Sequence, residues 1–260
     1  MRILYPSDPS SPKLPDGPFA AEFEAARSAG LSLSVFSFEE FENDGLRARP
    51  SFGTGERVLY RGWMLTAERY PALTAAIRAV GGVPITDPDQ YTLCHHLPQW
   101  YPILKELTPE TRIFARGEDF VSALKESDWP AYFVKDFVKS LTTKRGSRAD
   151  APEDIAAIIS QIEHYRGGIE GGVCVRQWED FVQGTERRFF VIRGKACGAD
   201  AEPIPEAVRV AAQRIASPFF SVDVAERRDG TVRIIEIGDG QVSDHKHWPI
   251  QRFVDMLASI

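Results

Sequence analysis

The hydrophobic positions of the first hundred residues switch between a period of two, typical of strands, and a period near 3.6, typical of helices. The runs 2–5 and 31–38 have the strand period, whereas 19–30 has helical spacing and ends at Gly30. The intervening segment 6–18 is rich in Pro, Ser and Asp and is expected to be a loop. By the same criteria, further strands are expected at 58–65 and 83–86, and further helices at 67–80 and 87–107. Strands that alternate with helices predict a parallel sheet, with ligands at the carboxyl ends of its strands.

The second part of the chain, after a plausible boundary at Thr108 and Pro109, mixes the two periods in a less regular order. The elements expected there are strands at 111–115, 131–134, 171–178 and 187–193, and helices at 117–126, 151–165, 205–215 and 249–260. Between them, the segment 140–148 is polar, basic and contains Gly146, which indicates a mobile loop. This order predicts an α+β unit that follows the α/β unit.

The stretch 219–243 carries the most informative polar positions, because two acidic residues interrupt otherwise apolar strands. Asp223 and Glu236 lie in runs separated by a turn at Gly230, so an antiparallel hairpin could bring their carboxylates close together. Carboxylates that lose solvation need compensation, and a hard cation such as Mg²⁺ provides it. Asp239, just beyond the second strand, is a further candidate ligand. The alternative is a surface hairpin with two half-exposed acids.

Composition limits the remaining possibilities. A length of 260 residues favours two domains, and a net charge of −6 gives no basic excess for a nucleic-acid partner. No apolar run approaches the roughly 20 residues that span a bilayer, and the N-terminus lacks the apolar core of a signal peptide. Three widely spaced cysteines without a CxxC pair indicate buried thiols in a reducing compartment. We therefore expect a cytoplasmic protein without a membrane or nucleic-acid partner.

Basic side chains at expected strand ends are candidates for binding anions. Lys135 follows an expected strand, and Lys139 and Lys144 flank a loop. Lys135 beside this basic loop could clamp phosphate, although it could also simply cap an edge strand. Arg61, with Trp63 beside it, ends a strand of the first sheet and could clamp a substrate carboxylate. An interdomain salt bridge is the alternative for Arg61.

The histidines carry weaker signals than these basic residues. His245 and His247 alternate along the chain, but two histidines without a third ligand are weak support for zinc. His95 and His96 fall in a helical segment, where a local structural role is expected.

The order of these groups, with basic residues first and metal-competent carboxylates last, resembles the ATP-grasp fold, and specific strings resemble its R2K clade. The strings are 60–65, 90–101, 108–109, 134–140, 175–179, 186–190 and 235–243, and the resemblance covers nearly the whole chain. The resemblance implies a Rossmann-like (pre-ATP-grasp) α/β domain at 1–108. An α+β ATP-grasp domain at 109–260 would follow, in two lobes of about 109–180 and 181–260.

The resemblance also implies roles for single residues. Lys135 would contact the adenine side and the α-phosphate of ATP, and Lys139 would face its phosphates. The hinge residues Gln177, Trp178 and Glu179 would present backbone groups to adenine, and Glu186 would bind the ribose hydroxyls. Arg188 and Lys139 would act on the phosphates and the developing acyl phosphate, and Asp223 and Glu236 would hold Mg²⁺. Many ATP-grasp enzymes have Asn two residues after the metal-binding Glu, and Gly238 stands there in this chain. Asp239 is the nearest replacement for that ligand.

The expected activity is ATP-dependent ligation of a carboxylate to an amine through an acyl phosphate, with Mg²⁺ as cofactor. The substrates would be small-molecule or peptide acids and amines, and the sequence predicts no oligomeric state. Two alternatives stay open: an ATP-binding module without ligase activity, favoured by Gly238, and a phosphotransferase on the same scaffold.

Overall fold

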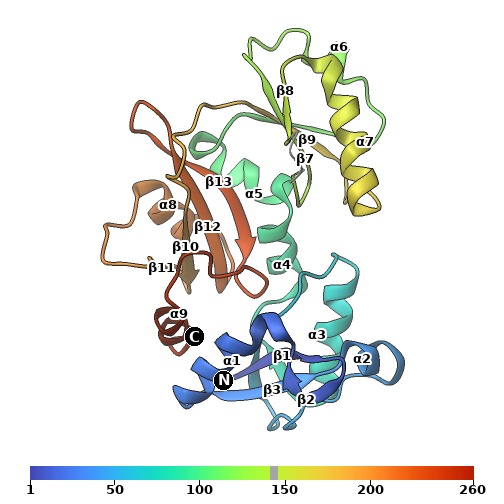
Figure 1. The fold of residues 1–260 in the computed structure, drawn as a ribbon, viewed down its shortest axis with the longest axis vertical. Coiled ribbons are helices and arrows are strands. Elements are labelled where there is room, and N and C mark those ends of the chain that lie inside the picture. The colour runs from blue at the N-terminus through green and yellow to red at the C-terminus, as the bar shows by residue number, and fades with distance from the viewer. Residues whose placement is uncertain (141–145) are drawn as a thin grey trace. The chain divides into compact units, whose positions relative to one another are not determined.

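The computed structural model describes residues 1–140 and 146–260, and Figure 1 shows its elements. The expected mobile loop 140–148 therefore lies largely outside the described residues. The chain forms two compact units that interleave along the sequence. Unit 1 comprises residues 1–92, 188–222 and 238–260, and unit 2 comprises 93–187 and 223–237. The domain limits expected from the sequence, 1–108 and 109–260, stay a prediction.

Unit 1 begins with the predicted parallel sheet. Its elements are β1 (Arg2–Asp8), β2 (Ser11–Pro15), α1 (Ala20–Ser28), β3 (Ser32–Phe36), α2 (Phe38–Asp44), β4 (Glu56–Tyr60), α3 (Arg69–Ala79) and β5 (Gly82–Pro84). Strand β1 pairs in parallel with β3 and β4, and β4 pairs in parallel with β5. Alternating strands and helices thus give the expected Rossmann-like order.

The hairpin of β1 and β2 was not expected, because Pro6 to Pro18 was predicted to be a loop. Strand β1 continues to Asp8, and β2 pairs antiparallel with its end, Ser7 opposite Pro15. An edge strand tolerates proline because its outer N–H groups have no strand to bond. The loop composition was therefore compatible with a short edge strand.

A second sheet has the order β11-β10-β12-β13, and its strands are β10 (Arg187–Ile192), β11 (Lys195–Cys197), β12 (Phe219–Glu226) and β13 (Val232–Asp239). Helices α8 (Glu206–Arg214) and α9 (Ile250–Leu257) accompany it. Strands β12 and β13 are the hairpin expected from the sequence, and they pass through both units.

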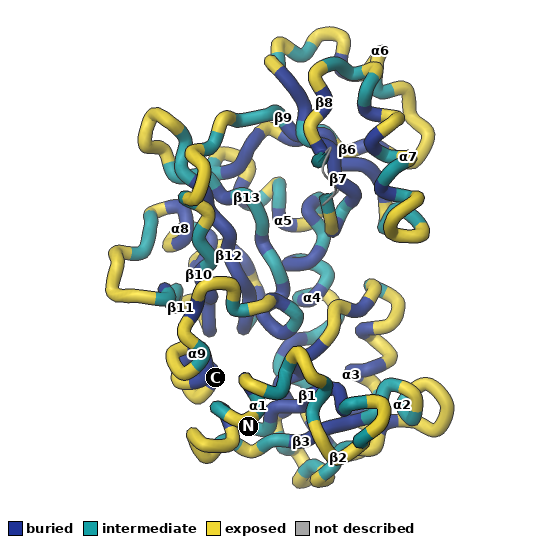
Figure 2. Tube along the Cα trace, in the orientation of Figure 1, coloured by how far each residue is buried: buried dark blue, intermediate teal, exposed yellow. Residues whose placement is uncertain are grey.

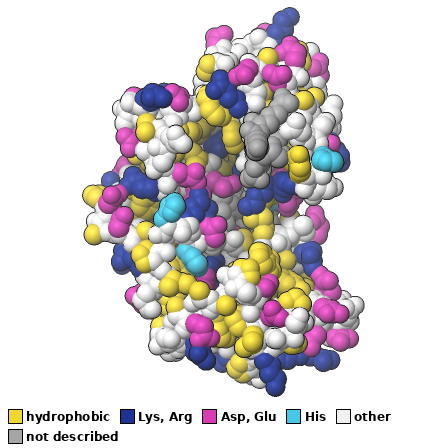
Figure 3. Space-filling model, viewed as in Figure 1, with side chains coloured by type: hydrophobic (Ala, Val, Ile, Leu, Met, Phe, Trp, Pro, Cys, Tyr) yellow, Lys and Arg dark blue, Asp and Glu magenta, His cyan; other side chains and the backbone are white. Residues whose placement is uncertain are grey.

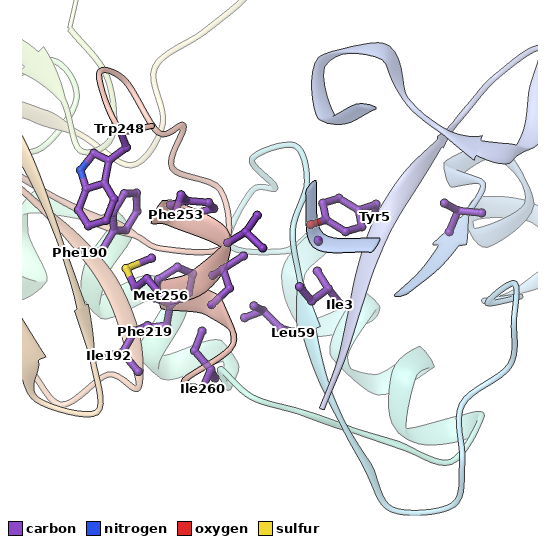
Figure 4. Close-up of a cluster of buried hydrophobic side chains, with 14 residues drawn as sticks. Ile3, Tyr5, Leu59, Phe190, Ile192, Phe219, Trp248, Phe253, Met256 and Ile260 are labelled. Atoms are coloured by element: carbon purple, nitrogen blue, oxygen red, sulfur yellow. The ribbon is translucent and has the colours of Figure 1, made fainter. Parts of the chain in front are cut away.

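The core of unit 1 joins this sheet to the parallel sheet through α9. Figure 4 shows Phe190, Phe219 and Met256 on one side of α9 and Ile3 and Leu59 on the other. All five side chains are buried. Burying aromatic and aliphatic side chains of this size contributes on the order of 2 kcal/mol each. The C-terminal helix therefore holds the core of unit 1 together.

Unit 2 contains a third sheet, antiparallel throughout, with the order β6-β9-β7-β8. Its strands are β6 (Thr111–Phe114), β7 (Tyr132–Asp136), β8 (Arg148–Ala149) and β9 (Val173–Gln177). Its helices are α5 (Leu97–Leu104), α6 (Phe120–Leu124) and α7 (Ile155–Arg166), and α4 (Pro88–His95) leads into the unit. One face of the sheet packs on α7, where Val134 and Val175 meet Ile158 in a buried cluster. The other face is therefore available for a site.

Burial follows the expected division between strands and connections. Figure 2 shows buried residues concentrated in the strands, and exposed residues in the connections and on the outer sides of helices. On the face drawn in Figure 3, acidic and basic side chains are interspersed. Among the described residues, no helix has both the length and the apolar character needed to cross a bilayer.

Candidate functional site

A cavity of about 390 Å³ lies within unit 2, on the face of the antiparallel sheet that does not pack on α7. Its lining residues are Pro109, Phe133, Lys135, Ser140, Arg176, Gln177, Trp178, Glu179, Asp180, Phe181, Glu186, Ile235 and Glu236. The volume falls in the range of small-molecule sites, and the lining combines aromatic walls with a few charged groups. Six of the predicted ATP-binding or metal-binding residues line it: Lys135, Gln177, Trp178, Glu179, Glu186 and Glu236.

The floor of the cavity results from strand alternation. Phe133 pairs with Arg176 across β7 and β9, two residues before Lys135 pairs with Cys174. Because Val134 and Val175 point into the core, their neighbours Phe133, Lys135 and Arg176 point to the opposite face. The apolar period of two in these strands therefore places both cations on the cavity side.

Lys135 and Glu236 form an ion pair at the wall of the cavity. The Nζ of Lys135 lies 3.0 Å from Oε1 of Glu236, and the Lys135 side chain is 5% exposed whereas that of Glu236 is 37% exposed. These residues are the predicted phosphate clamp and the predicted metal ligand, 101 positions apart. The structure thus brings the two central residues of the expected site together within unit 2.

Arg176 is a charged residue that was not included in the expected ATP-binding set. Its Nη1 donates to the carbonyl of Ile235 at 2.7 Å and its Nη2 donates to Oγ1 of Thr108 at 2.5 Å. Its Nε is buried without a hydrogen-bond partner. Burial lowers the pKa of Arg176 to about 10, although the nearby carboxylate of Glu236 acts in the opposite direction. The sequence signal was an arginine inside the apolar run of β9.

The hinge between β9 and the following loop is fixed by its backbone and by one carboxylate. The N–H of Gln177 donates to the carbonyl of Glu110 at 2.7 Å, and the N–H of Trp178 donates to that of Ala131 at 2.9 Å. The two oxygens of Glu179 accept from Arg233 at 3.0 and 3.1 Å. Both oxygens of the Glu179 carboxylate are therefore hydrogen-bonded to the guanidinium of Arg233.

The aromatic wall beside the hinge is built around Trp178. Its ring lies 6.3 Å from that of Phe133, and the guanidinium of Arg148 lies 4.8 Å from its centroid. Such a wall suits a planar heteroaromatic ligand, which stacks on aromatic faces. Glu186 is exposed at the edge of the same cavity.

The other predicted ligands of ATP or metal are not in the cavity lining. Lys139 is exposed at the end of the turn that begins at Lys135. Arg188, in unit 1, donates to the carbonyl of Asp244 at 2.9 Å and to its Oδ1 at 2.8 Å. Asp223 is buried on β12, which is the neighbour of β13 in the sheet. The roles expected for these three residues stay predictions.

Asp239 is fully buried at the end of β13. Its Oδ1 accepts from the N–H of Gln241 at 2.9 Å and from Nε2 of Gln241 at 3.0 Å, whereas its Oδ2 has no hydrogen-bond partner. Burial raises the pKa of Asp239 to about 7. An unpaired buried carboxylate oxygen is a fitting donor for a hard cation. Within the described residues, no three His, Cys, Asp or Glu side chains gather as a complete metal site, but Mg²⁺ usually needs fewer protein ligands than that.

Arg61 lies in a buried network in unit 1. It bonds Glu22 through both nitrogen positions of its fork, Nε to Oε1 at 2.9 Å and Nη2 to Oε2 at 2.6 Å. Its Nη1 donates to the carbonyls of Gly240, Gln241 and Ser243 at 2.8–3.1 Å. The salt-bridge partner Glu22 belongs to the same expected domain as Arg61, whereas the three carbonyls belong to the expected second domain, so the interdomain salt bridge stays a prediction. A substrate role stays a prediction.

Trp63 and the histidines lie at different depths. Trp63 is 46% exposed and donates to Asp16 at 2.8 Å. His245 contacts Glu22 at 3.2 Å, and His95 is buried, which lowers its pKa to about 3. A buried neutral His95 agrees with the structural role expected for it.

Comparison with solved structures identifies the fold. D-cycloserine synthetase DcsG superimposes with a TM-score of 0.67 at 18% identity, covering 100% of this chain and 99% of that one. The ATP-grasp ligase PsnB, solved with a minimal precursor, Mg and ADP, gives 0.63 at 12% identity, covering 99% and 96%. A RimK domain protein of the ATP-grasp type from Sphaerobacter thermophilus gives 0.63 at 16% identity, covering 99% and 100%.

The parallel sheet followed by two antiparallel sheets is therefore the ATP-grasp architecture, and the expected fold class is confirmed. The profile described as "ATP-grasp domain, R2K clade family 3" matches residues 118–257, which are 140 of the 260 residues. The chain belongs to this family, as its sequence strings predicted. No curated protein matches the chain at a significant level.

Proposed function

We propose that the protein is an ATP-dependent ligase that joins a carboxylate to an amine through an acyl phosphate, releasing ADP and phosphate. The observation that carries the proposal is the cavity of unit 2, where Lys135 and Glu236 meet beside the aromatic hinge. Membership of an ATP-grasp family and the fold shared with ATP-grasp ligases support it.

The cavity offers aromatic side chains for the base of a nucleotide and cationic side chains for its phosphates. The aromatic wall of Phe133 and Trp178 offers a stacking surface for a purine, next to backbone groups of the hinge. The ammonium of Lys135 and the guanidinium of Arg176 supply positive charge for phosphate oxygens. Glu186 at the cavity edge would accept from ribose hydroxyls.

The reaction itself needs charge compensation more than a nucleophile from the protein. Transfer of the γ-phosphoryl group to a substrate carboxylate brings two anions together and forms a mixed anhydride with release of ADP. Attack of an amine on the acyl carbon then expels phosphate and forms the amide. Lys139 and Arg188 would offset the negative charge that develops on the transferred group.

Magnesium would be held by Asp223 and Glu236, with Asp239 as the third candidate, and when bound it would neutralise phosphate oxygens. The position of Glu236 in the cavity lining and its partial exposure support its part in this assignment. Glu236 would exchange its bond to Lys135 for the cation, which would leave the lysine for phosphate.

The solved relatives point to two substrate classes. DcsG is a D-cycloserine synthetase, and PsnB is solved with a precursor peptide. We therefore propose a small molecule or a peptide as the source of the carboxylate, and Arg61 and Trp63 as candidate substrate residues.

The first prediction concerns Glu236. Wild-type protein mixed with ATP, Mg²⁺ and a panel of acids and amines should release ADP only when a suitable acid and amine are both present. Glu236→Gln should lower that rate by at least about a hundredfold, because the neutral amide neither holds Mg²⁺ nor pairs with Lys135. Coupled detection of ADP measures the rate, and Glu163→Gln on the outer side of α7 is the matched control.

Three outcomes separate the functions. Release of ADP with one acceptor and a stable phosphorylated product would indicate a phosphotransferase instead. Binding of ATP without turnover for any pair would indicate an ATP-binding module. Wild-type turnover that Glu236→Gln leaves intact would remove Glu236 from the site.

A further inference from the structure

The segment 135–140 forms a tight turn, here called the lysine turn, that carries both lysines predicted to bind phosphate. The N–H of Asp136 donates to the carbonyl of Lys139 at 3.0 Å, and Lys135 and Ser140 form an isolated antiparallel bridge. Lys135 and Ser140 line the cavity. The shape of this turn therefore sets where the two ammonium groups lie.

The carboxylate of Asp136 lies inside the turn and uses both of its oxygens. Oδ1 accepts from the N–H of Val138 at 2.8 Å and from the N–H of Lys139 at 2.5 Å. Oδ2 accepts from the N–H of Glu170 at 3.2 Å and from Nη1 of Arg166. The residue is 1% exposed, so its charge is compensated by these donors rather than by water.

A second anchor is the ring of Phe137, which packs on a pair of glycines. A Cβ at Gly171 would come within 2.2 Å of this ring, and a Cβ at Gly172 would come within 2.9 Å of it. The backbone of Phe137 makes two further hydrogen bonds. Its N–H donates to the carbonyl of Glu170 at 3.3 Å, and its carbonyl accepts from the N–H of Leu97 at 2.9 Å. The turn is thus seated on the connection between α7 and β9.

We infer that Asp136 is a positioning residue that, together with Arg166 and the glycine pair, fixes the lysine turn for a nucleoside polyphosphate. The inference rests on the proposed function, because the ligand it names is the nucleotide of that site. Asp136 itself does not touch the ligand, since its oxygens are taken up by four donors. Its effect reaches the phosphates only through Lys135 and Lys139.

The chemistry of the turn requires an acceptor-only side chain at this position. An ionised carboxylate accepts at both oxygens, whereas the amide of Asn donates from one end. In Asp136→Asn, the NH₂ group would face N–H donors in either orientation of the amide. In one orientation the donors are those of Arg166 and Glu170, and in the other they are the backbone N–H groups of Val138 and Lys139. The substitution is almost isosteric, so it should loosen the turn without removing volume from the core.

The test compares ligands with and without phosphates, using isothermal titration of the full chain with ATP, ADP and adenosine. Asp136→Asn and Arg166→Gln should each raise the Kd for ATP and ADP about tenfold or more, and leave the Kd for adenosine within about twofold. Adenosine lacks the phosphates with which the two ammonium groups would pair. A merely structural defect would weaken all three ligands alike.

Matched controls come from the same unit. Asp119→Asn changes another carboxylate that accepts a backbone N–H, that of Ser122 at the start of α6, away from the cavity. Arg116→Gln removes another arginine that bonds an acid at α7, Glu163. Neither control should change the Kd for ATP.

The outcomes are distinct for the inference and for the proposed function. Equal weakening for ATP and adenosine, or unchanged ATP affinity in both variants, would overturn the positioning role while leaving nucleotide binding intact. A wild-type chain that binds neither ATP nor ADP would overturn the proposed function, and the inference with it. If Asp136→Asn fails to fold, Arg166→Gln decides, because Arg166 is partly exposed at the end of α7.

Discussion

At the scale of single residues, the buried ion pair of Glu22 and Arg61 has a structural role in unit 1. Glu22 accepts from both Arg61 nitrogens, from Tyr5 and from His245, and it is 1% exposed. Burial alone would raise the pKa of Glu22, but the charge and hydrogen bonds of Arg61 outweigh it and lower the pKa to about 2. Since Arg61 also holds three carbonyls beyond β13, the pair fixes the segment that follows Asp239.

Glu22→Gln should destabilise unit 1 by about 3–5 kcal/mol at pH 7, because it leaves Arg61 buried without a counter-charge. The folded pKa of Glu22 lies below its ordinary value of 4.5, so its contribution is complete above that pH and is lost as the pH falls towards 2. Urea unfolding of wild type and variant from pH 7 to pH 3 measures the difference. The gap should narrow below about pH 4.5, because Glu22 of the unfolded chain takes up a proton there while the folded carboxylate stays ionised until the pH approaches 2.

Glu24→Gln on the same helix is the control, because Glu24 pairs with Arg27 in an exposed salt bridge. Its effect should stay within about 1 kcal/mol at every pH. A Glu22→Gln gap that is the same at pH 7 and pH 3 would contradict the assigned pKa.

At the scale of elements, β13 supports the hinge as well as carrying Glu236. Arg233 on this strand holds Glu179 through two hydrogen bonds, and it also donates to the carbonyls of Glu106 and Thr108 at 2.8 and 2.5 Å. One strand thereby connects the hinge, the start of the antiparallel sheet and the predicted metal ligand. The hinge geometry consequently depends on a residue outside the cavity lining.

Arg233→Met should weaken ATP and adenosine alike, by about tenfold, because losing the Glu179 pair releases the hinge rather than the phosphate side. Arg228→Met is the control, since Arg228 pairs with Asp180 in an exposed bridge close by. Titration of both ligands measures the effect. Loss of ATP affinity alone would place the role of Arg233 at the phosphates instead.

The elements themselves could be predicted where hydrophobic period and length agree. The strands around Lys135 and Arg176 and the hairpin of β12 and β13 follow from apolar alternation, and the family strings indicated their order. The short strands β2, β8 and β11 were not predicted, because five residues or fewer of mixed polarity carry no periodic signal.

Side-chain partners were harder to predict than elements. Glu22 lies 39 positions from Arg61 on an amphipathic helix, and its sequence context does not differ from that of an exposed glutamate such as Glu24. Arg176 was visible as a charge in an apolar strand, but its bonds to Thr108 and Ile235 depend on the packing of three segments. Tertiary partners of this kind are set by the fold and not by local pattern.

At the scale of the whole molecule, three clusters of buried hydrophobic side chains each lie within one of the two units. The clusters around Phe253 and around Tyr70 belong to unit 1, and the cluster around Ile158 belongs to unit 2. All residues that line the cavity belong to unit 2, although they come from both of its chain segments. Ligand binding should therefore act first on the stability of unit 2.

Hydrogen exchange should locate this effect. A non-hydrolysable ATP analogue with Mg²⁺ binds only the folded site, so it should slow exchange of amides in β7, β9 and the hinge by at least about tenfold at saturation. The parallel strands β1, β3 and β4 of unit 1 serve as the internal reference and should change by less than about twofold. Mass spectrometry of peptides from both units, with and without the analogue, measures the difference. Protection confined to the parallel sheet would place the nucleotide in unit 1 and remove the cavity at Lys135 and Glu236 as its site.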